Sequence, residues 1–386
     1  MSDWKKGRLD KFFTLKRGYD LPKQNRNSGN IPIVSSSGVT DYHNIAQIEE
    51  SGVITGRYGT IGEVFYSKVP FWPLNTTLYV NDFKSNDKKF VYYLLKTLNW
   101  SQFNDKSAVP GVNRNHVHEL EISFPDICEQ KSIASVLSSL DDKIDLLHRQ
   151  NKTLESMAET LFRQWFIEES QADWETTTLD CHITVAKGLS YKGSGLTTSD
   201  NGIPLFNLNS VLEGGGYKST GIKYYNGDFK ERHIIKSGDI IVANTEQGHE
   251  YRLIGYPAII PTTKSELSIY THHLFKININ DDSYLTNAFM YYLLCSKDMH
   301  EQVVAATNGS TVNQLSADGL QRPEFKLPLE YKVKEFTTQI ASFWKKISIN
   351  NLQIKNIESL RDTLLPKLMS GEVRVQYAEE AIASVA

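Results

Sequence analysis

The sequence has little of three things that would classify it at once: cysteine, long apolar runs and charge of one sign. Its three cysteines, Cys128, Cys181 and Cys295, lie far apart and form no Cys-x-x-Cys pair, which argues against a zinc module and against a disulfide framework. No apolar run approaches the roughly 20 residues that cross a bilayer, and no apolar segment follows the first six residues, as a secretory signal requires. We therefore expect a cytoplasmic protein in a reducing environment, with no membrane partner.

Charge of either sign is close to balanced. The formal net charge is −3, so bulk charge gives no support to nucleic-acid binding, and any such activity must come from local patches. Aromatic residues are plentiful, with 17 Phe, 19 Tyr and 6 Trp among 386 residues, which excludes wholesale disorder. At roughly 100–200 residues per domain, this length predicts two or three domains.

The motifs of several enzyme classes are also missing. The sequence contains no Asn/Asp-Pro-Pro-aromatic loop of an adenine methyltransferase, no Gly-x-x-x-x-Gly-Lys-Ser/Thr loop of a translocase and no His-Glu-x-x-His zinc motif. Gly214-Gly215-Gly216 is typical of a plain turn, and His272-His273 is better interpreted as sheet residues in a polar cleft than as a metal site or general base. The sequence therefore predicts no active site, cofactor or metal on this chain.

The most informative feature that is present is internal similarity at about half the chain length. The matched segments, in order, are Trp4…Leu9-Asp10 with Trp174…Leu179-Asp180, Gly18 with Gly188, Ile31-Pro32 with Ile203-Pro204, Ser51-Gly52 with Ser237-Gly238, Thr76-Thr77-Leu78 with His272-His273-Leu274, residues 90–95 with 289–294, Val112-Asn113 with Val312-Asn313, and Phe124-Pro125 with Leu327-Pro328. One match alone is at chance level, but eight in the same order indicate a duplication. The period is too long for a solenoid repeat, so each copy is predicted to be a domain with an appendix.

Each appendix has the heptad pattern of a long helix. The apolar seam of the first copy consists of Ile133, Leu137, Leu140, Ile144, Leu147, Asn151, Leu154 and Leu161; that of the second consists of Ile340, Phe343, Ile347, Asn350, Ile354, Ile357 and Leu364. Asp126 with Glu129 indicates a capping box at the first helix, and Pro366 should end or kink the second. An ordinary amphipathic surface helix is the alternative, but two long stripes favour a coiled coil between them. The single Asn in each seam either fixes the register or lies at a splayed edge.

The regions before the helices alternate short β-branched or aromatic runs with turn residues. Strands are expected over 31–34, 52–55 and 64–66 in the first copy and over 239–242 and 256–260 in the second, and helices over 88–98 and 285–294. We predict an α+β fold with two similar globular domains, each followed by a long helix, the two helices pairing as an antiparallel coiled coil. The expected boundaries are 1–125, 126–171, 172–328 and 329–373, with a tail over 374–386.

Duplication also suggests a geometry. Two copies packed about a pseudo-twofold axis would place their helices antiparallel and their globular domains at opposite ends. About 30 helical residues span roughly 45 Å, which exceeds the roughly 34 Å of one B-DNA turn. A rigid spacer with two diverged domains suits a split, asymmetric site.

The combination of motifs resembles the specificity subunit (HsdS type) of type I restriction–modification systems. In the first copy the resemblance is based on residues 56–62 (GRYGTIG), 74–77 (LNTT), 111–114 (GVNR) leading to Phe124-Pro125, Glu129-Gln130 and residues 161–166 (LFRQWF); at the end of the second it is based on residues 364–373 (LLPKLMSGEV). The second copy departs from the pattern, because residues 244–249 (NTEQGH) replace the loop with Gly56, Gly59 and Gly62. The resemblance therefore does not extend to that loop in the second copy.

This resemblance implies two target-recognition domains, each reading a few base pairs of one half of a bipartite site in double-stranded DNA. It implies that the paired helices set the unread spacer, and that two modification (adenine methyltransferase) subunits and then restriction/translocase subunits dock on the chain. The chemistry, with S-adenosylmethionine, ATP and Mg, would belong to those partners.

Candidate DNA contacts follow from the chemistry of phosphates and base edges. Phosphates attract Lys, Arg and small polar groups, Arg suits guanine, and Asn or Gln suits adenine. The candidates are Lys16, Arg17, Arg57, Tyr58, Thr60, Asn75, Thr76, Asn113 and Arg114 in the first copy, and Lys187, Asn207, Asn244, Gln247, Arg252, His272 and Asn313 in the second. For each of them the alternative is a turn cap or a solvated charge. Tyr92-Tyr93 and Tyr291-Tyr292 could stack on bases, but their helical context favours the core.

A different class of function stays open at this point. The chain could be a duplicated adaptor whose coiled coil binds protein and whose globular domains bind protein or glycan. A DNA-binding subunit should show salt-dependent affinity for duplex DNA, whereas an adaptor should show none.

Overall fold

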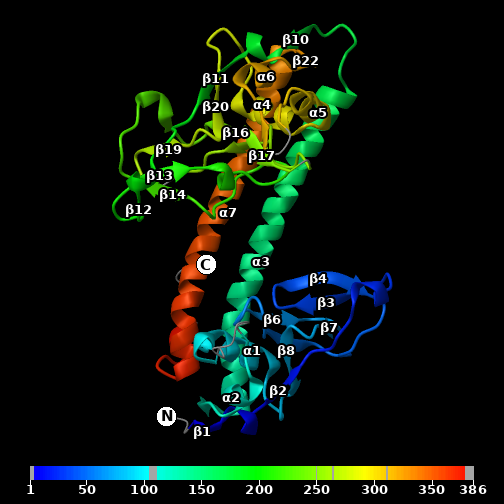
Figure 1. The fold of residues 1–386 in the computed structure, drawn as a ribbon, viewed down its shortest axis with the longest axis vertical. Coiled ribbons are helices and arrows are strands. Elements are labelled where there is room, and N and C mark those ends of the chain that lie inside the picture. Colours follow the sequence, from blue (N-terminus) through cyan, green and yellow to red (C-terminus); the bar gives the residue numbers. More distant parts are fainter. Residues whose placement is uncertain (1–3, 104–110, 249, 263–264, 310–311, 379–386) are drawn as a thin grey trace. The chain divides into compact units, whose positions relative to one another are not determined.

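The computed structural model describes residues 4–103, 111–248, 250–262, 265–309 and 312–378 (Figure 1). The predictions for the first three residues, for His249 and for the last eight residues of the tail lie outside the described residues. The chain divides into two compact units: unit 1 is Met1–His148 with Asn351–Ala386, and unit 2 is Arg149–Asn350. Each unit contains parts of both long helices, so this division does not test the predicted domain boundaries. Within the described part, no helix is long and apolar enough to cross a membrane.

Unit 1 contains two small sheets. The first has the order β2 (Thr14–Arg17), β8 (Thr77–Asp82), β5 (Gly52–Gly56) and β6 (Val64–Ser67), with antiparallel neighbours; the second has the order β4 (Gly38–His43), β3 (Ile31–Ser35) and β7 (Trp72–Pro73), with β3 parallel to β7. A separate pair joins β1 (Lys5–Arg8) to β9 (Glu121–Phe124), and the short helices are α1 (Lys88–Thr97) and α2 (Arg114–His118). The strands expected at 31–34, 52–55 and 64–66 and the helix expected at 88–98 are confirmed.

Helix α1 forms where the sequence provides both a cap and an apolar face. The Asp87 carboxylate accepts the N–H of Phe90 at 2.8 Å, which satisfies a donor that has no partner inside the helix. Phe90, Val91 and Leu95 are buried in one core with β2, β5 and β8. The same core includes the unit 1 parts of both long helices.

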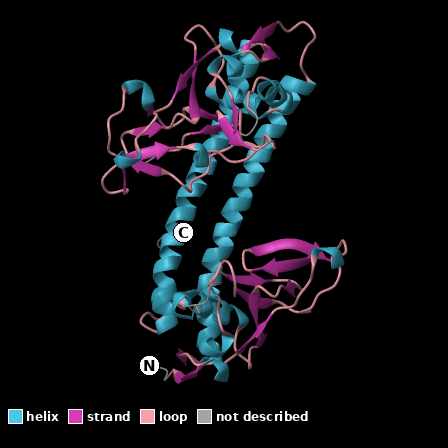
Figure 2. Ribbon diagram, viewed as in Figure 1, coloured by secondary structure: helices cyan, strands magenta, loops and turns pink. Residues whose placement is uncertain are grey.

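Unit 2 repeats this strand order with extra strands; Figure 2 shows the strands and helices of the structure in separate colours. Its first sheet has the order β11 (Ile183–Lys187), β20 (Leu274–Ile279), β16 (Ile240–Ala243) and β18 (Pro257–Ile259); its second has the order β12 (Leu196–Thr197), β14 (Lys223–Tyr225), β13 (Ile203–Phe206), β19 (Ser268–Tyr270) and β15 (Ile234–Ile235). Two further pairs are β10 (Thr176–Thr178) with β22 (Glu324–Lys326) and β17 (Thr245–Gln247) with β21 (Val312–Gln314), and the short helices are α4 (Asn287–Cys295), α5 (Lys297–Ala305) and α6 (Ala317–Gln321). Because β13 and β19 are parallel as β3 and β7 are, the predicted duplication is confirmed at the level of strand order.

The hydrogen bonds correct three of the eight internal matches. The N–H of Arg57 donates to Thr76 O at 2.8 Å, and the N–H of Asn244 donates to His273 O at 3.1 Å. His273 therefore corresponds to Thr76, and the match of His272-His273-Leu274 with Thr76-Thr77-Leu78 is wrong by one residue. Gly52 pairs with Ser67 at the start of β5, and Asp239 bonds to Ile260 at the corresponding place next to β16. Gly52 therefore corresponds to Asp239, and the match of Ser51-Gly52 with Ser237-Gly238 is also shifted by one residue.

The third correction concerns Asn113. It is the N-cap of α2, whereas Ser316 is the N-cap of α6. Ser316 therefore corresponds to Asn113, and Asn313 lies three residues earlier, on β21. Letter matching does not detect such shifts, because the equivalence of two strand positions is defined by the residues that they pair with on the neighbouring strands.

The two long helices are α3 (Ile127–Arg163), with 37 residues, and α7 (Glu330–Ser370), with 41. Within unit 1, Asp141 of α3 forms an ion pair with Arg361 of α7 at 2.9 Å. Within unit 2, Asn151 of α3 contacts Asn350 of α7, and Phe162, farther along α3, contacts Phe336, which lies earlier in α7. The helices therefore pair antiparallel, as predicted.

The seam positions predicted from the heptads face the interior. Every one of them is buried or half-buried: Ile133, Leu137, Leu140, Ile144, Leu147, Asn151, Asn350, Ile354, Ile357, Leu364 and Ile340 are buried, and Leu154, Leu161, Phe343 and Ile347 are half-buried. At the start of α3 the Asp126 carboxylate accepts the N–H groups of Cys128 and Glu129 at 2.8 and 2.9 Å, which caps the helix.

Of the two outcomes expected at Pro366, an end or a kink of α7, the end is wrong. The helix continues through Pro366 to Ser370, because a proline removes one backbone hydrogen bond while Leu368 and Met369 beyond it are buried in the unit 1 core. The helix ends instead at Gly371, which has a φ of +74°, a conformation that glycine adopts without strain.

The two seam asparagines form a buried pair within unit 2. The Nδ2 of Asn350 donates to Oδ1 of Asn151 at 2.8 Å, and the exposed fractions of the two side chains are 0% and 8%. This arrangement excludes the splayed-edge alternative. A matched polar pair in an apolar seam disfavours other registers, because a shift would leave each amide against apolar side chains.

We expect Asn350→Leu to lower the free energy of unfolding of the full chain by about 1–3 kcal/mol, because the Asn151 amide loses this partner inside the seam. The double variant Asn151→Leu/Asn350→Leu should recover that loss, since no amide then faces leucine. Thermal or urea unfolding measures both effects, and Asn356→Leu, at an exposed position of the same helix, is the control. A double variant as unstable as the single one would contradict a register-fixing pair.

Candidate nucleic-acid interface

Several predicted DNA-contact residues of unit 1 gather at one end of its four-stranded sheet. Because neighbouring strands are antiparallel, the carboxyl ends of β2 and β5 lie beside the amino end of β8. Arg17 ends β2, Arg57 follows β5, and Asn75 and Thr76 precede β8. Strand order therefore brings together residues that are up to 59 positions apart in the sequence.

Backbone hydrogen bonds tie these segments to one another. The N–H groups of Arg57 and Tyr58 both donate to Thr76 O, at 2.8 and 3.1 Å, and the N–H of Gly18 donates to Thr77 O at 3.0 Å. The N–H of Val112 donates to Arg57 O at 3.0 Å, which adds the start of α2 to the group. The loops are thus held in place before any ligand binds, which reduces the entropic cost of binding.

The Arg57 guanidinium is held against the neighbouring tyrosine. Its guanidinium carbon lies 4.3 Å from the centre of the Tyr58 ring, and its Nη2 donates to the Tyr58 hydroxyl oxygen at 3.1 Å. Among the described residues no carboxylate pairs with Arg57. A planar cation supported on an aromatic face keeps its remaining N–H groups available for a base edge or a phosphate.

The neighbouring candidates differ in how available they are. Lys16, Arg17, Thr60 and Arg114 are exposed, which suits phosphate contacts. Arg17 lies 3.6 Å from the carboxylate of Asp20.

Asparagines 75 and 113 of this unit are both engaged within the protein. Asn75 donates its Nδ2 to Asp20, and Asn113 accepts the N–H of Asn115 at 3.0 Å as the N-cap of α2. Thr76 has a buried Oγ1 without a hydrogen-bond partner among the described residues. Asn113 therefore has the turn-cap role that the sequence left open, and Asn75 is oriented by an acid.

Helix α2 is anchored to the sheet by His118. Its Nε2 accepts the N–H of Leu15, on β2, at 2.9 Å, which requires a neutral ring nitrogen. Burial lowers the pKa of His118 below its usual value, so the neutral form is favoured. This contact supports the position of Asn113 at the other end of α2.

The equivalent end of the unit 2 sheet carries different side chains. Lys187 ends β11, and His272 and His273 precede β20. The Nδ1 of His273 contacts Thr245 Oγ1 at 3.0 Å, and burial together with neighbouring positive groups lowers the pKa of His273. His272 has a buried Nδ1 without a partner among the described residues. Lys187, which is exposed, and the two histidines form the counterpart of the unit 1 group.

Two asparagines predicted to contact DNA are occupied within unit 2. Asn244, 3% exposed, donates its Nδ2 to His272 O at 3.0 Å. Asn207, 7% exposed, donates to Gly221 O at 2.7 Å and accepts the N–H of Asn209 at 2.9 Å. Both side chains stabilise turns of the protein, and their amide groups are buried there.

The remaining three candidates of unit 2 lie outside its four-stranded sheet. Gln247 ends β17 and is exposed; Asn313, on β21, is 1% exposed and donates its Nδ2 to Gly248 O. Arg252 forms ion pairs with Glu250 at 3.0 Å and with Glu213 at 3.8 Å. Of these three, only Gln247 is exposed and has a side chain without a hydrogen-bond partner among the described residues.

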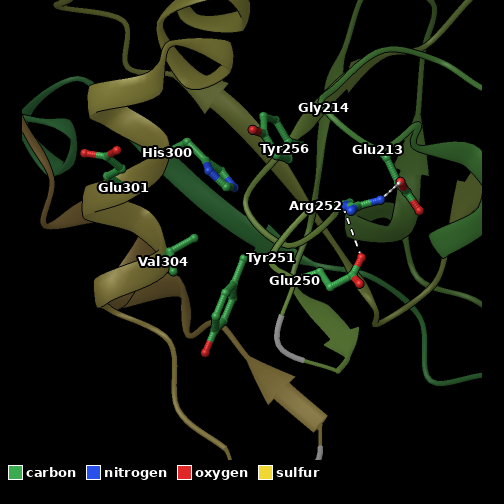
Figure 3. A pocket seen from close by; sticks show the side chains of 9 residues that line it. All are labelled: Glu213, Gly214, Glu250, Tyr251, Arg252, Tyr256, His300, Glu301 and Val304. Carbon is green, nitrogen blue, oxygen red and sulfur yellow. Dashed lines mark ion pairs between the residues drawn. The ribbon is translucent and has the colours of Figure 1, made fainter. Parts of the chain in front are cut away.

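Arg252 lines a surface pocket of unit 2 of about 610 Å³ (Figure 3). Its lining includes Tyr256 and His300, whose rings stack at 3.9 Å between centres. Three carboxylates also line it, those of Glu213, Glu250 and Glu301. Three carboxylates against one arginine repel phosphate. The lining of this pocket therefore does not suit a phosphate group.

The paired tyrosines belong to the core. Tyr93 and Tyr292 are 2% and 4% exposed; the Tyr93 hydroxyl donates to Asp141 at 2.7 Å, and the Tyr292 hydroxyl accepts the indole N–H of Trp344 at 3.2 Å. Burial raises the pKa of both hydroxyls well above the ordinary value. The predicted preference for core over base stacking is supported by these contacts.

Three residues that matter for the site were not among the candidates: Gly111, Thr245 and His273. Gly111 pairs with Tyr58, and Thr245 corresponds to Tyr58 because the preceding residues, Arg57 and Asn244, make equivalent bonds. His273 was missed because the two copies were aligned one residue out of register. Gly111 stood in the GVNR motif and His273 in the His272-His273 pair, but the sequence did not show which residues they pair with, because that depends on strand pairing.

Comparison with known proteins agrees with this arrangement. Residues 1–156 match the family described as the type I restriction modification DNA specificity domain. The chain is 26% identical over 312 residues to the type I restriction enzyme MjaIX specificity subunit of Methanocaldococcus jannaschii, covering 75% of this chain and 69% of that one, and 23% identical over 330 residues to the HindI specificity subunit of Haemophilus influenzae, covering 68% and 71%.

A solved structure shares the fold. The S subunit of a type I restriction–modification system from M. genitalium superposes with a TM-score of 0.60 at 17% sequence identity, covering 95% of this chain and 96% of that one. Domain, relatives and fold agree with the resemblance seen in the motifs. Residues 1–156 therefore match a type I restriction modification DNA specificity domain, and the chain as a whole is similar to specificity subunits of type I restriction–modification systems.

Proposed function

We propose that this chain is the non-catalytic subunit that gives a type I restriction–modification complex its DNA sequence specificity. Each unit reads one half of a bipartite, asymmetric site in double-stranded DNA. The observation that carries this proposal is that one strand order occurs twice with different side chains at equivalent positions: Arg57 and Asn75 in unit 1, Asn244 and His272 in unit 2. Identical units would suit a palindrome, whereas unlike units suit two unlike half-sites.

The sheet end of unit 1 is where we place its DNA contacts. Exposed Lys16, Arg17 and Arg114 provide phosphate contacts that position the protein, and Arg57 on the Tyr58 ring provides direct readout of a base edge. In unit 2, Lys187 and Gln247 take the corresponding roles beside His272.

The chemistry is assigned to partner subunits. We propose that two modification (adenine methyltransferase) subunits and then restriction/translocase subunits dock on this chain, and that S-adenosylmethionine, ATP and Mg bind to those partners. The long helices α3 and α7 set the length of the unread spacer between the half-sites.

Mapping methylated adenines across a genome tests the proposal. Cells that express the modification subunit with this chain should methylate one split sequence, and cells with the modification subunit alone should not. Binding of the purified complex to a duplex with that sequence should weaken steeply with salt. Methylation that does not depend on this chain, or binding without salt dependence, would favour an adaptor instead.

A further inference from the structure

The backbone conformation at Gly111 does not require a glycine. Its φ is not among the positive values of the chain's glycines, so an L-residue could adopt its conformation. A Cβ at this position, however, would lie 2.2 Å from Cε1 and 2.7 Å from Cδ1 of the Tyr58 ring. The space that a side chain would need is therefore occupied by that ring.

The equivalent pairing in unit 2 provides an internal comparison. Tyr58 pairs with Gly111 in an antiparallel bridge, and Thr245 pairs with Gln314 in the corresponding place on β17 and β21. In unit 2 the position of the Tyr58 ring is occupied by the small side chain of Thr245, and its partner Gln314 has a long side chain. A residue without a side chain, Gly111, is therefore found only in the unit where its partner carries a ring.

The ring in turn supports Arg57. The guanidinium carbon lies 4.3 Å from the ring centre, and the hydroxyl oxygen accepts a hydrogen bond from Arg57 Nη2. A side chain at 111 would push the ring out of this position, since ring carbons in the middle of the side chain cannot yield without a rotation of the whole group.

We propose that Gly111 is a positioning residue for DNA recognition: by leaving room for the Tyr58 ring, it holds the Arg57 guanidinium ready for one half of the target. The inference is based on the proposed function of Arg57. Unit 2 has no such device, so the effect of changing Gly111 is confined to the half-site that unit 1 reads.

A double-mutant cycle between Gly111 and Tyr58 tests the inference in the complex of the full chain with its modification subunits. The variants are Gly111→Ala, Tyr58→Ala and both together, with Gly193→Ala as the matched control because nothing lies within 4 Å of a Cβ at Gly193. The probes are the duplex carrying the mapped target and two duplexes in which one or the other half-site is scrambled.

Gly111→Ala should lower affinity for the target roughly tenfold, with discrimination lost only in the half-site of unit 1. In the Tyr58→Ala background the same change should have less than about a twofold effect, since the crowded ring is gone. An equal loss in both backgrounds, or a loss in both half-sites, would overturn the inference and indicate a backbone role.

Two further results distinguish a loss of folding from a loss of DNA recognition. If Gly111→Ala alone prevents folding, as thermal unfolding would show, adding Tyr58→Ala should restore it; failure of both variants to fold would overturn the inference. A wild-type complex that does not distinguish the target from scrambled DNA would refute the proposed function itself, before any variant is compared.

Discussion

Arg57→Ala should remove most of the sequence discrimination at one half-site and leave the other half-site unchanged. The expected loss is about 1–3 kcal/mol, or roughly fivefold to 150-fold, because a planar guanidinium that contacts a base edge cannot be replaced by water. The side chain has no carboxylate partner among the described residues and is supported by the Tyr58 ring, so its removal leaves no buried acid unpaired. The measurement is competition binding of the modification complex with half-site variants, together with the methylation map.

Two companion variants separate the possible contacts of Arg57. Arg57→Lys keeps the charge and loses the planar fork, so it should retain phosphate binding and still lose base discrimination. Arg8→Ala, at an exposed ion pair with Asp10, is the matched control and should change neither half-site. A uniform loss across all sequences with a salt dependence reduced by about one unit would indicate a phosphate contact, and an equal loss at both half-sites would indicate a structural role.

Insertion of one heptad into each long helix should lengthen the spacer of the target and preserve both half-site sequences. The insertion points are between His148 and Arg149 in α3 and between Asn350 and Asn351 in α7, where the chain passes from one unit to the other. Seven residues keep the phase of the seam and add about 10.5 Å, or roughly three base pairs at 3.4 Å each.

The insertion leaves the contacts of each unit intact. Asp141 with Arg361 stays within unit 1, and Asn151 with Asn350 stays within unit 2. Methylation mapping reads the spacer directly. The control inserts the heptad in α3 alone, which mismatches the pair and should cost activity at every spacing. An unchanged spacer in the double insertion would contradict the role proposed for the helices.

The structure also shows which candidate side chains are free to contact a ligand and which already form hydrogen bonds within the protein, a distinction that residue type alone does not give. Asn207, Asn244 and Asn113 were all reasonable adenine readers by residue type, yet the structure shows each engaged with a backbone group. Asn is a frequent turn cap because its side chain imitates a backbone carbonyl or amide. A residue type therefore indicates what a side chain can contact, whereas its neighbours decide what it does contact.

The sequence alone determined the duplication, the two long helices, most of the strands and the family resemblance, because periodicity and motif order are properties of the chain read in one dimension. It could not determine the register that sets His273 beside Asn244, the amides that are already satisfied, or the ring of Tyr58 in the space left by Gly111. These depend on which distant strands become neighbours, and strand pairing exists only once the chain has folded.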